Sequence, residues 1–198
     1  MKDNKGFSLV ELIIAIAVMS VILGMLIGNL GYINNSAAKG CANSIKTAIG
    51  QTRIKTMGKQ ETYLYIYRDG KGYSMNLINT DSKTGTSLAE DKDELAASKV
   101  SVSYVVNKVT GGAGSEISLD SDGDYMLIGF DRETGKVNTY TDSSNTSVFQ
   151  FTQDGSSVTK NVNVASDINT IVIKVQSGNN IYEITLYGAT GKVKMEKK

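Results

Sequence analysis

MKDNKGFSLVELIIAIAVMSVILGMLIG, residues 1–28, is the stretch that decides the architecture of this chain. A short charged head ends at Gly6, and a strongly apolar run begins at Phe7. Residues 12–28 carry no charge, and a helix needs roughly 20 apolar residues to span a bilayer. The stretch therefore predicts a membrane-inserted helix at the start of the chain.

A single carboxylate interrupts this apolar run. Glu11 is the one charged residue between Phe7 and Lys39, and charged side chains inside membrane segments mark functional sites. Two interpretations leave Glu11 unexplained and stay open. One is a plain membrane anchor. The other is a secretory signal peptide cut after the small residues 36–38, although its apolar region is normally only about 7–15 residues long.

A third interpretation explains the carboxylate. The segment Gly6-Phe7-Ser8-Leu9-Val10-Glu11 resembles the processing motif of type IV prepilins and pseudopilins, in which a glycine ends a basic leader and Glu is the fifth residue after the cut. The resemblance implies a leader of residues 1–6, cleavage between Gly6 and Phe7 by a prepilin peptidase, and N-methylation of Phe7. It also implies that Glu11 is an assembly contact, because the amine of a neighbouring subunit then neutralises a charge that is costly to bury alone.

The same resemblance implies a location and partners. Lys2 and Lys5 favour a cytoplasmic N-terminus by the positive-inside rule, so we expect a single-pass membrane protein that later joins an extracellular or cell-surface filament. The expected partners are other pilin or pseudopilin subunits, an inner-membrane assembly platform, and membrane lipid before assembly.

The helix is expected to continue beyond the apolar run in amphipathic form, from Phe7 to Met57, and to end at Gly58. Residues 7–30 form its transmembrane or assembly part. Small and apolar residues then recur at spacings of three and four, which marks one buried helical face: Ala37, Ala38, Cys41, Ile45, Ala48, Ile49 and Thr52. Cys41 is expected to pack on that face, with an intermolecular disulfide or a lipid site as the alternative.

Glycines destabilise the middle of this helix. Gly24, Gly28 and Gly31 lie close together, and each glycine costs a helix roughly 1 kcal/mol relative to alanine. We expect the region 24–34 to kink or melt on assembly. The alternative is that the glycines permit close packing between helices.

Composition narrows the class of protein to which the chain can belong. The 198 residues carry a net charge of +1, one cysteine, and no histidine, tryptophan or proline. This balance makes nucleic acid an unlikely main partner, and one cysteine excludes an internal disulfide. Many Gram-negative major pilins have a C-terminal disulfide loop, so the departure favours a pseudopilin, a minor pilin or a Gram-positive pilin.

Residues 58–198 are expected to form one globular β-rich head. Residues 62–68 and 73–78 predict a hairpin. Residues 79–98 are polar and predict a loop, with a short helix within 87–98. Alternating segments separated by turn residues predict further strands at 100–109, 116–119, 125–131, 136–141, 148–153, 158–164, 170–176, 181–186 and 192–195. The predicted class is α+β, a type IV pilin-like fold with the long helix packed on an antiparallel sheet or sandwich.

A second resemblance concerns the head. The segment that spans the end of the helix and the hairpin, residues 49–75, is similar to GspH/FimT-type minor pseudopilins and pilins, in which the helix leads to a strand, a tight turn and a return strand. The ending at 181–193 also looks like the closing hairpin of that family. The resemblance implies a minor pilin or pseudopilin.

Two sets of charged residues are candidate sites. Asp120, Asp122 and Asp124 could ligate Ca²⁺ through carboxylate oxygens, although an Asp/Gly turn is the simpler interpretation. Lys192 and Lys194 lie in a basic C-terminal end, and FimT-like relatives suggest DNA binding there; a solvated tail is the simpler interpretation.

Neither catalysis nor a cofactor is predicted. The chain has no histidine for acid–base work or zinc binding, and its serines form no nucleophile motif such as Gly-x-Ser-x-Gly. Two function classes remain: a structural subunit of a type IV pilus-like filament or type II secretion-like pseudopilus, and a membrane-anchored extracellular adhesin or ligand-binding domain that does not polymerise.

Overall fold

The computed structural model describes residues 8–58, 61–70, 72–80, 87–89, 93–97, 100–112, 114–142 and 168–198. A long helix, α1 (Leu9–Met57), is followed by strands β1 (Glu61–Asp69), β2 (Gly72–Thr80), β3 (Ser87–Ala89), β4 (Asp93–Ala97), β5 (Ser101–Lys108), β6 (Glu116–Ser118), β7 (Tyr125–Phe130), β8 (Val137–Asp142), β9 (Ile168–Ser177), β10 (Asn180–Tyr187) and β11 (Val193–Lys197).

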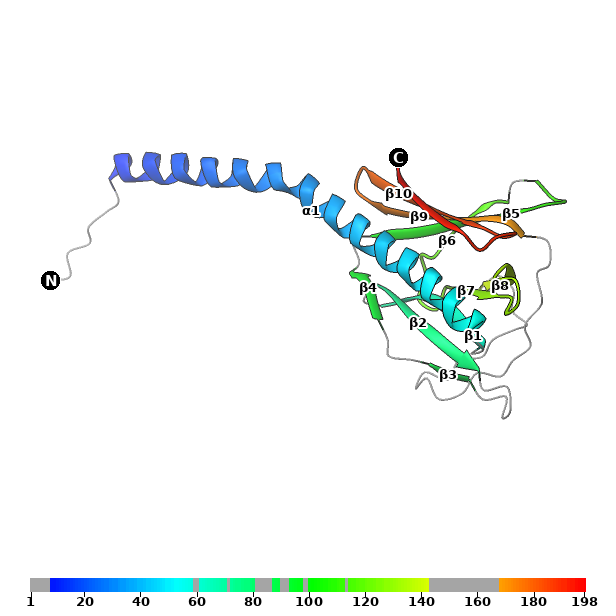
Figure 1. Cartoon of the computed structure of the whole chain (residues 1–198). Helices are drawn as coiled ribbons and strands as arrows, with labels where there is room; N and C mark the ends of the chain where they lie inside the picture. The colour runs from blue at the N-terminus through cyan, green and yellow to red at the C-terminus, as the bar shows by residue number, and fades with distance from the viewer. Residues whose placement is uncertain are drawn as a thin grey trace.

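Helix α1 has two different surroundings. Its first half projects away from the head, and its second half lies along the head, with a gentle bend between them (Figure 1). Its 49 residues make it about 73 Å long. The backbone of the region 24–34 is helical throughout, so its kinking or melting on assembly stays a prediction. The helix ends at Met57, and the N–H of Gly58 donates to the Ile54 carbonyl at 2.9 Å.

Two antiparallel sheets form the head. The first has the order β3-β2-β1-β7-β8, with β4 also paired to β2, and the second has the order β11-β10-β9-β5-β6. The chain passes to the second sheet after β4, returns after β6, and crosses again after β8. Because α1 contacts strands of both sheets, the helix closes one side of the space between them.

The main core lies where α1 meets the two sheets. Leu64 and Ile66 of β1, Ile173 of β9 and Ile184 of β10 are fully buried in one cluster with α1. Neighbouring side chains of a strand point to opposite faces of its sheet, so alternate residues of each strand reach this core. Of the predicted helix stripe, Ala37 is only partly buried, and the others are buried together with Ala42 and Thr56: Ala38, Cys41, Ile45, Ala48, Ile49 and Thr52.

The packing of Cys41 is confirmed, since only 1% of the residue is exposed. Burial raises the pKa of its thiol to about 12, because the charged thiolate is disfavoured away from water. The thiol therefore behaves as a small apolar group, which disfavours the alternative of a disulfide or lipid site.

A tyrosine hydroxyl joins the two sheets. Tyr73 of β2 is 1% exposed, and its hydroxyl donates to the Leu119 carbonyl at 2.9 Å. The same oxygen accepts from the Val102 N–H at 3.2 Å and from Arg68 Nη1 at 3.0 Å. One donor and two lone pairs are thereby all used, so the buried hydroxyl is satisfied and fixes the sheets relative to each other.

The expected fold class is confirmed at the level of a long N-terminal helix and an antiparallel β head, which is consistent with a pilin-like fold. The hairpin at 62–78 forms as β1 and β2. The expectation of a loop with a short helix within 87–98 is wrong, because β3 and β4 occupy this region. Pairing with β2 and burial of Leu95 override the helix propensity of this Ala- and Glu-rich segment. The strands expected at 148–153 and 158–164 lie outside the described residues.

Candidate functional site

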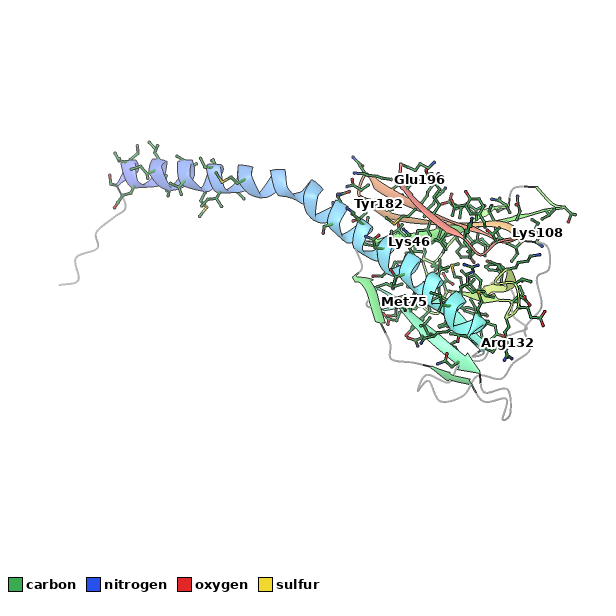
Figure 2. The ribbon with its side chains drawn as sticks, viewed as in Figure 1. Lys46, Met75, Lys108, Arg132, Tyr182 and Glu196 are labelled. Atoms are coloured by element: carbon green, nitrogen blue, oxygen red, sulfur yellow. The ribbon has the colours of Figure 1, made fainter. Side chains whose placement is uncertain are left out.

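The projecting half of α1, residues 9–25, exposes apolar side chains in all directions (Figure 2). Each of its large apolar residues is more than half exposed: Leu9, Val10, Leu12, Ile13, Ile14, Ile16, Val18, Met19, Val21, Ile22, Leu23 and Met25. A soluble monomer rarely exposes so large a continuous apolar surface. This half therefore calls for an apolar environment that the head does not provide.

The start of α1 shows a role for Glu11 that the sequence interpretation missed. The Ser8 N–H donates to Glu11 Oε2 at 3.1 Å, and the Val10 N–H donates to Ser8 Oγ at 3.4 Å. Together they form a capping box, in which the N-cap serine and the third helical residue satisfy each other's backbone groups. The pattern Ser-x-x-Glu before an apolar run is the signal that would have found it. Gly6 and Phe7, the expected cleavage and methylation residues, lie outside the described residues.

Polar groups inside the projecting half are satisfied locally. The Ser20 hydroxyl donates to the Ile16 carbonyl at 2.8 Å, one turn earlier in the helix. Such a back-bond leaves the hydroxyl with no need for an external partner. Ser20 is therefore compatible with apolar surroundings.

The sequence places a transmembrane or assembly part at residues 7–30, of which Phe7 and the side chains from 26 onward lie outside the described residues. Within the described part of the chain, no helical segment combines the length and hydropathy required for a bilayer crossing.

The junction between the projecting half and the head is held by asparagines. Asn35 Oδ1 accepts from the Tyr182 hydroxyl at 2.9 Å and from Lys197 Nζ at 3.1 Å. Asn34 lies against Gly178, whose φ of +57° suits the β9–β10 turn. Residues 36–38, the alternative signal-peptidase site, lie inside α1, and Ala38 is fully buried. A cut there would break the helix where it begins to contact the head.

The acidic segment at 120–124 forms a tight turn docked on the β1–β2 hairpin. Asp124 Oδ2 accepts from the Ser121 N–H at 2.8 Å, and the Gly123 N–H donates to the Arg68 carbonyl at 3.1 Å. Asp120 and Asp122 are exposed. Among the described residues, no group of three or more Asp, Glu, Cys or His side chains is arranged to hold a metal ion. The backbone forms an Asp/Gly turn, and calcium binding by Asp120, Asp122 and Asp124 stays a prediction.

The structure separates the two lysines singled out for DNA binding. Lys194 Nζ lies 2.6 Å from Glu196 Oε1, and this hydrogen bond raises the pKa of Lys194 and lowers that of Glu196. Lys192 instead lines a hollow of about 380 Å³ between α1 and the β10–β11 turn. The two lysines thus have different neighbours, and DNA binding by them stays a prediction.

The tyrosines of β1 form a second cluster on the face of the first sheet opposite α1. Tyr63 and Tyr65 are almost fully buried there with Ile78 and Leu127. Desolvation raises the pKa of both tyrosines, and for Tyr63 a hydrogen bond to Glu61 adds to the effect. Period-two alternation gives the helix side of β1 to Leu64 and Ile66, so these tyrosines lie on the other face of the sheet.

Comparison with known proteins agrees with the N-terminal resemblance. Residues 1–27 match the family model described as the prokaryotic N-terminal methylation motif. No curated protein and no solved structure matches the chain. The N-terminal motif therefore supports a type IV pilin-family prepilin, whereas the GspH/FimT assignment rests on the sequence resemblance alone.

The motif has consequences for the class of protein. It suggests a structural protein rather than an enzyme, and it implies processing by a prepilin peptidase and assembly with other pilin subunits. It also implies membrane anchoring before assembly and a surface filament afterwards. The exposed projecting half of α1 is the part of the structure to which these consequences apply.

Proposed function

We propose that this chain is a structural subunit, a minor pilin or pseudopilin, of a type IV pilus-like filament or a type II secretion-like pseudopilus. In this proposal a prepilin peptidase cuts between Gly6 and Phe7, Phe7 is N-methylated, and the subunit polymerises through α1. The single cysteine, which excludes the disulfide loop of many major pilins, supports a minor pilin or pseudopilin.

The apolar surface of the projecting half carries the proposal. Residues 9–25 expose large apolar side chains around the whole circumference of the helix, and burying each fully is worth about 1.5–3 kcal/mol. Lipid covers such a surface before assembly, and the helices of neighbouring subunits cover it in a filament. A prepilin motif at the start of the same helix supports the second environment as the final one.

Glu11 is proposed to change partners on assembly. In the isolated subunit its carboxylate accepts the Ser8 N–H at 3.1 Å. Cleavage before Phe7 creates a cationic amine, and the amine of a neighbouring subunit then pairs with Glu11. The carboxylate thus contributes to the helix start in the membrane and to the contact between subunits in the filament.

N-terminal analysis of purified surface filaments tests the proposal. The chain should be present and should begin at N-methylated Phe7, as read by intact mass and N-terminal sequencing. A chain that begins at Met1, or after Ala38, or that stays in the membrane fraction while filaments form without it, contradicts the proposal. Those results favour a membrane-anchored adhesin or binding domain that does not polymerise.

Substitution of Glu11 separates its two roles. Glu11→Gln keeps a side chain that can complete the capping box but removes the charge. We expect normal membrane insertion and a loss of more than about tenfold in the amount recovered in filaments, because a buried amine without its partner costs about 3–5 kcal/mol. Immunoblots of membrane and filament fractions measure both quantities.

Ser8→Ala is the matched control for that variant. It removes the N-cap, which costs the helix about 1 kcal/mol, and it keeps the charge of Glu11. We expect filament incorporation close to that of the unmodified chain. Equal losses for the Gln and Ala variants would mean that helix capping, rather than the charge, explains the need for Glu11.

A further inference from the structure

A cationic hollow lies on the outer side of α1, near the end of the helix. Lys46, Gly50, Arg53 and Ile54 form its helix wall, and the β10–β11 turn at residues 191–193 forms the other wall. Figure 2 shows Lys46 on the stretch of α1 that runs along the head. The hollow thus offers positive charge on both walls beside the exposed apolar side chain of Ile54.

Among the described residues, no ion pair joins the positive charges of the hollow to an acidic side chain. Arg53 Nε donates to the Gly135 carbonyl at 3.1 Å, which anchors the side chain without neutralising it. Within the described part of the chain, the ion pairs of the second sheet involve Lys174, Lys194 and Lys198 instead. Lys46, Arg53 and Lys192 therefore present three uncompensated cations around one hollow.

Glycines keep the hollow open for an approaching chain. A Cβ added at Gly50 would meet nothing within 4 Å, so the helix backbone is accessible there. Gly191 has a φ of +61°, and a Cβ at that position would lie 2.1 Å from the Gly135 carbonyl oxygen. The β10–β11 turn therefore packs closely on the loop after β7 and cannot carry a larger side chain.

The acidic turn at residues 120–124 lies at the opposite end of the head. It precedes β7, whereas Gly135 beside the hollow follows β7. Contacts of β1 support the same arrangement. The start of β1 lies at the end of α1, where Thr56 Oγ1 donates to the Thr62 carbonyl. The Arg68 N–H, at the far end of β1, donates to the Asp124 carbonyl.

Two carboxylates of the acidic turn, those of Asp120 and Asp122, are available for contact with a partner. Asp120 and Asp122 are exposed, and within the described residues neither carboxylate takes part in an ion pair or hydrogen bond. Arg68 of the hairpin is engaged with the Tyr73 hydroxyl and lies 5.2 Å from the Tyr73 ring centroid. Its guanidinium is thus directed to the tyrosine.

We propose that the hollow is the docking site for the acidic turn, residues 120–124, of a second copy of this chain. The two surfaces have opposite charge and lie at opposite ends of the head. A contact between different surfaces of identical subunits does not close on itself unless the rotation forms a ring, so it extends into an open polymer. The inference rests on the proposed function as a filament subunit and adds a contact between heads to the one between helices.

Disulfide trapping in assembled filaments tests the contact. The full chain carrying Lys192→Cys and Asp122→Cys is produced in cells that make the filament, and mild oxidation should give a ladder of covalently linked subunits. Cys41 is buried, so it does not compete for these links. Monomers alone, in filaments whose two new cysteines both react with a small alkylating reagent, overturn the proposal.

Charge reversal gives an independent measurement. Lys192→Glu should lower the amount of subunit recovered in filaments by about two- to fivefold, the range for an exposed ion pair, and adding Asp122→Lys should restore it. Lys194→Glu is the matched control, because Lys194 already pairs with Glu196 outside the hollow. Gly50→Leu fills the hollow without changing its charge or weakening the helix, and it should reduce recovery as Lys192→Glu does. Loss without rescue by Asp122→Lys overturns the proposal.

The controls separate this proposal from the proposed function. If the unmodified chain is absent from filaments or unprocessed, both fail. If it begins at Phe7 in filaments but gives no ladder and no charge rescue, the head contact alone fails. Salt-sensitive binding of duplex DNA that Lys192→Glu abolishes, without a ladder, assigns the hollow to a polyanion and overturns the docking of a second copy.

Discussion

In the projecting half of α1, Leu12 and Ile14 are each more than half exposed, whereas Ile45 and Ile49, in the packed half at residues 37–57, are fully buried. Both halves are regular helix, so the difference lies in how apolar residues are distributed around the axis. The packed half has one apolar stripe and binds one surface, its own head. The projecting half is apolar all round and needs a surrounding partner. One helix thus joins an intramolecular core to an intermolecular one.

The largest expected effect contrasts isoleucines in the two halves. Ile45→Ala should lower the free energy of unfolding of the full chain in detergent by about 2–5 kcal/mol, because it opens a cavity in the core. Ile14→Ala should change it by less than about 0.5 kcal/mol and should instead reduce filament yield. Urea denaturation followed by circular dichroism measures the first quantity. Equal destabilisation by both would break the comparison.

A glycine pair should give the next largest effect. Gly191→Ala places a Cβ against the Gly135 carbonyl oxygen in a residue with a φ of +61°, and we expect a loss of about 1–3 kcal/mol in the free energy of unfolding. Gly24→Ala in the projecting half meets nothing within 4 Å and should strengthen the helix locally by about 1 kcal/mol. Thermal unfolding of the head distinguishes them, since only the first variant should lower its midpoint.

A further effect, confined to high pH, is a pH dependence of the packed half. The pKa of Cys41 is raised from its ordinary value of 9.0 to about 12 by burial, so the folded state holds the proton that the unfolded state loses. The corresponding stability is fully present below about pH 9 and is lost as the pH rises towards 12. Tyr63 and Tyr65 also titrate at high pH with raised pKa values, so the difference between the unmodified chain and Cys41→Ala isolates the thiol.

Alkylation tests the burial of the Cys41 thiol directly. Native Cys41 should resist iodoacetamide at pH 8 until the head unfolds, because the thiol is buried and protonated. Lys39→Cys, on the exposed side of the same helix, should react at once. Rapid modification of native Cys41 would show that the packed half opens far more readily than its core contacts indicate.

Periodicity made much of this fold predictable. The three- and four-residue spacing from Ala37 to Thr52 indicates the packed stripe because a helical face repeats with the turn. Alternation in β1 and β2 indicates their hairpin for the corresponding reason in strands. Residues 87–97 resisted prediction because their composition favours helix, whereas pairing with β2 decides the outcome.

The candidate sites also differ in how far the sequence alone could predict them. The motif from Gly6 to Glu11 is contiguous, so the sequence displays it directly. The hollow joins residues 46–54 to residues 191–193, and the Tyr73 hydroxyl joins strands of two sheets. Contacts between residues so far apart in the chain have no local pattern, and the sequence could not indicate them.

The contacts at Asn35 have a mechanical consequence. A pull on α1 along its axis, as in a filament under tension, is passed to the head at this residue, where Tyr182 and Lys197 hold its side chain. Both partners belong to the last two strands, and β11 pairs with β10 along residues 182–186. The load is therefore passed to two paired strands rather than to one. The C-terminal strand acts as a tether that resists peeling of the helix from the head.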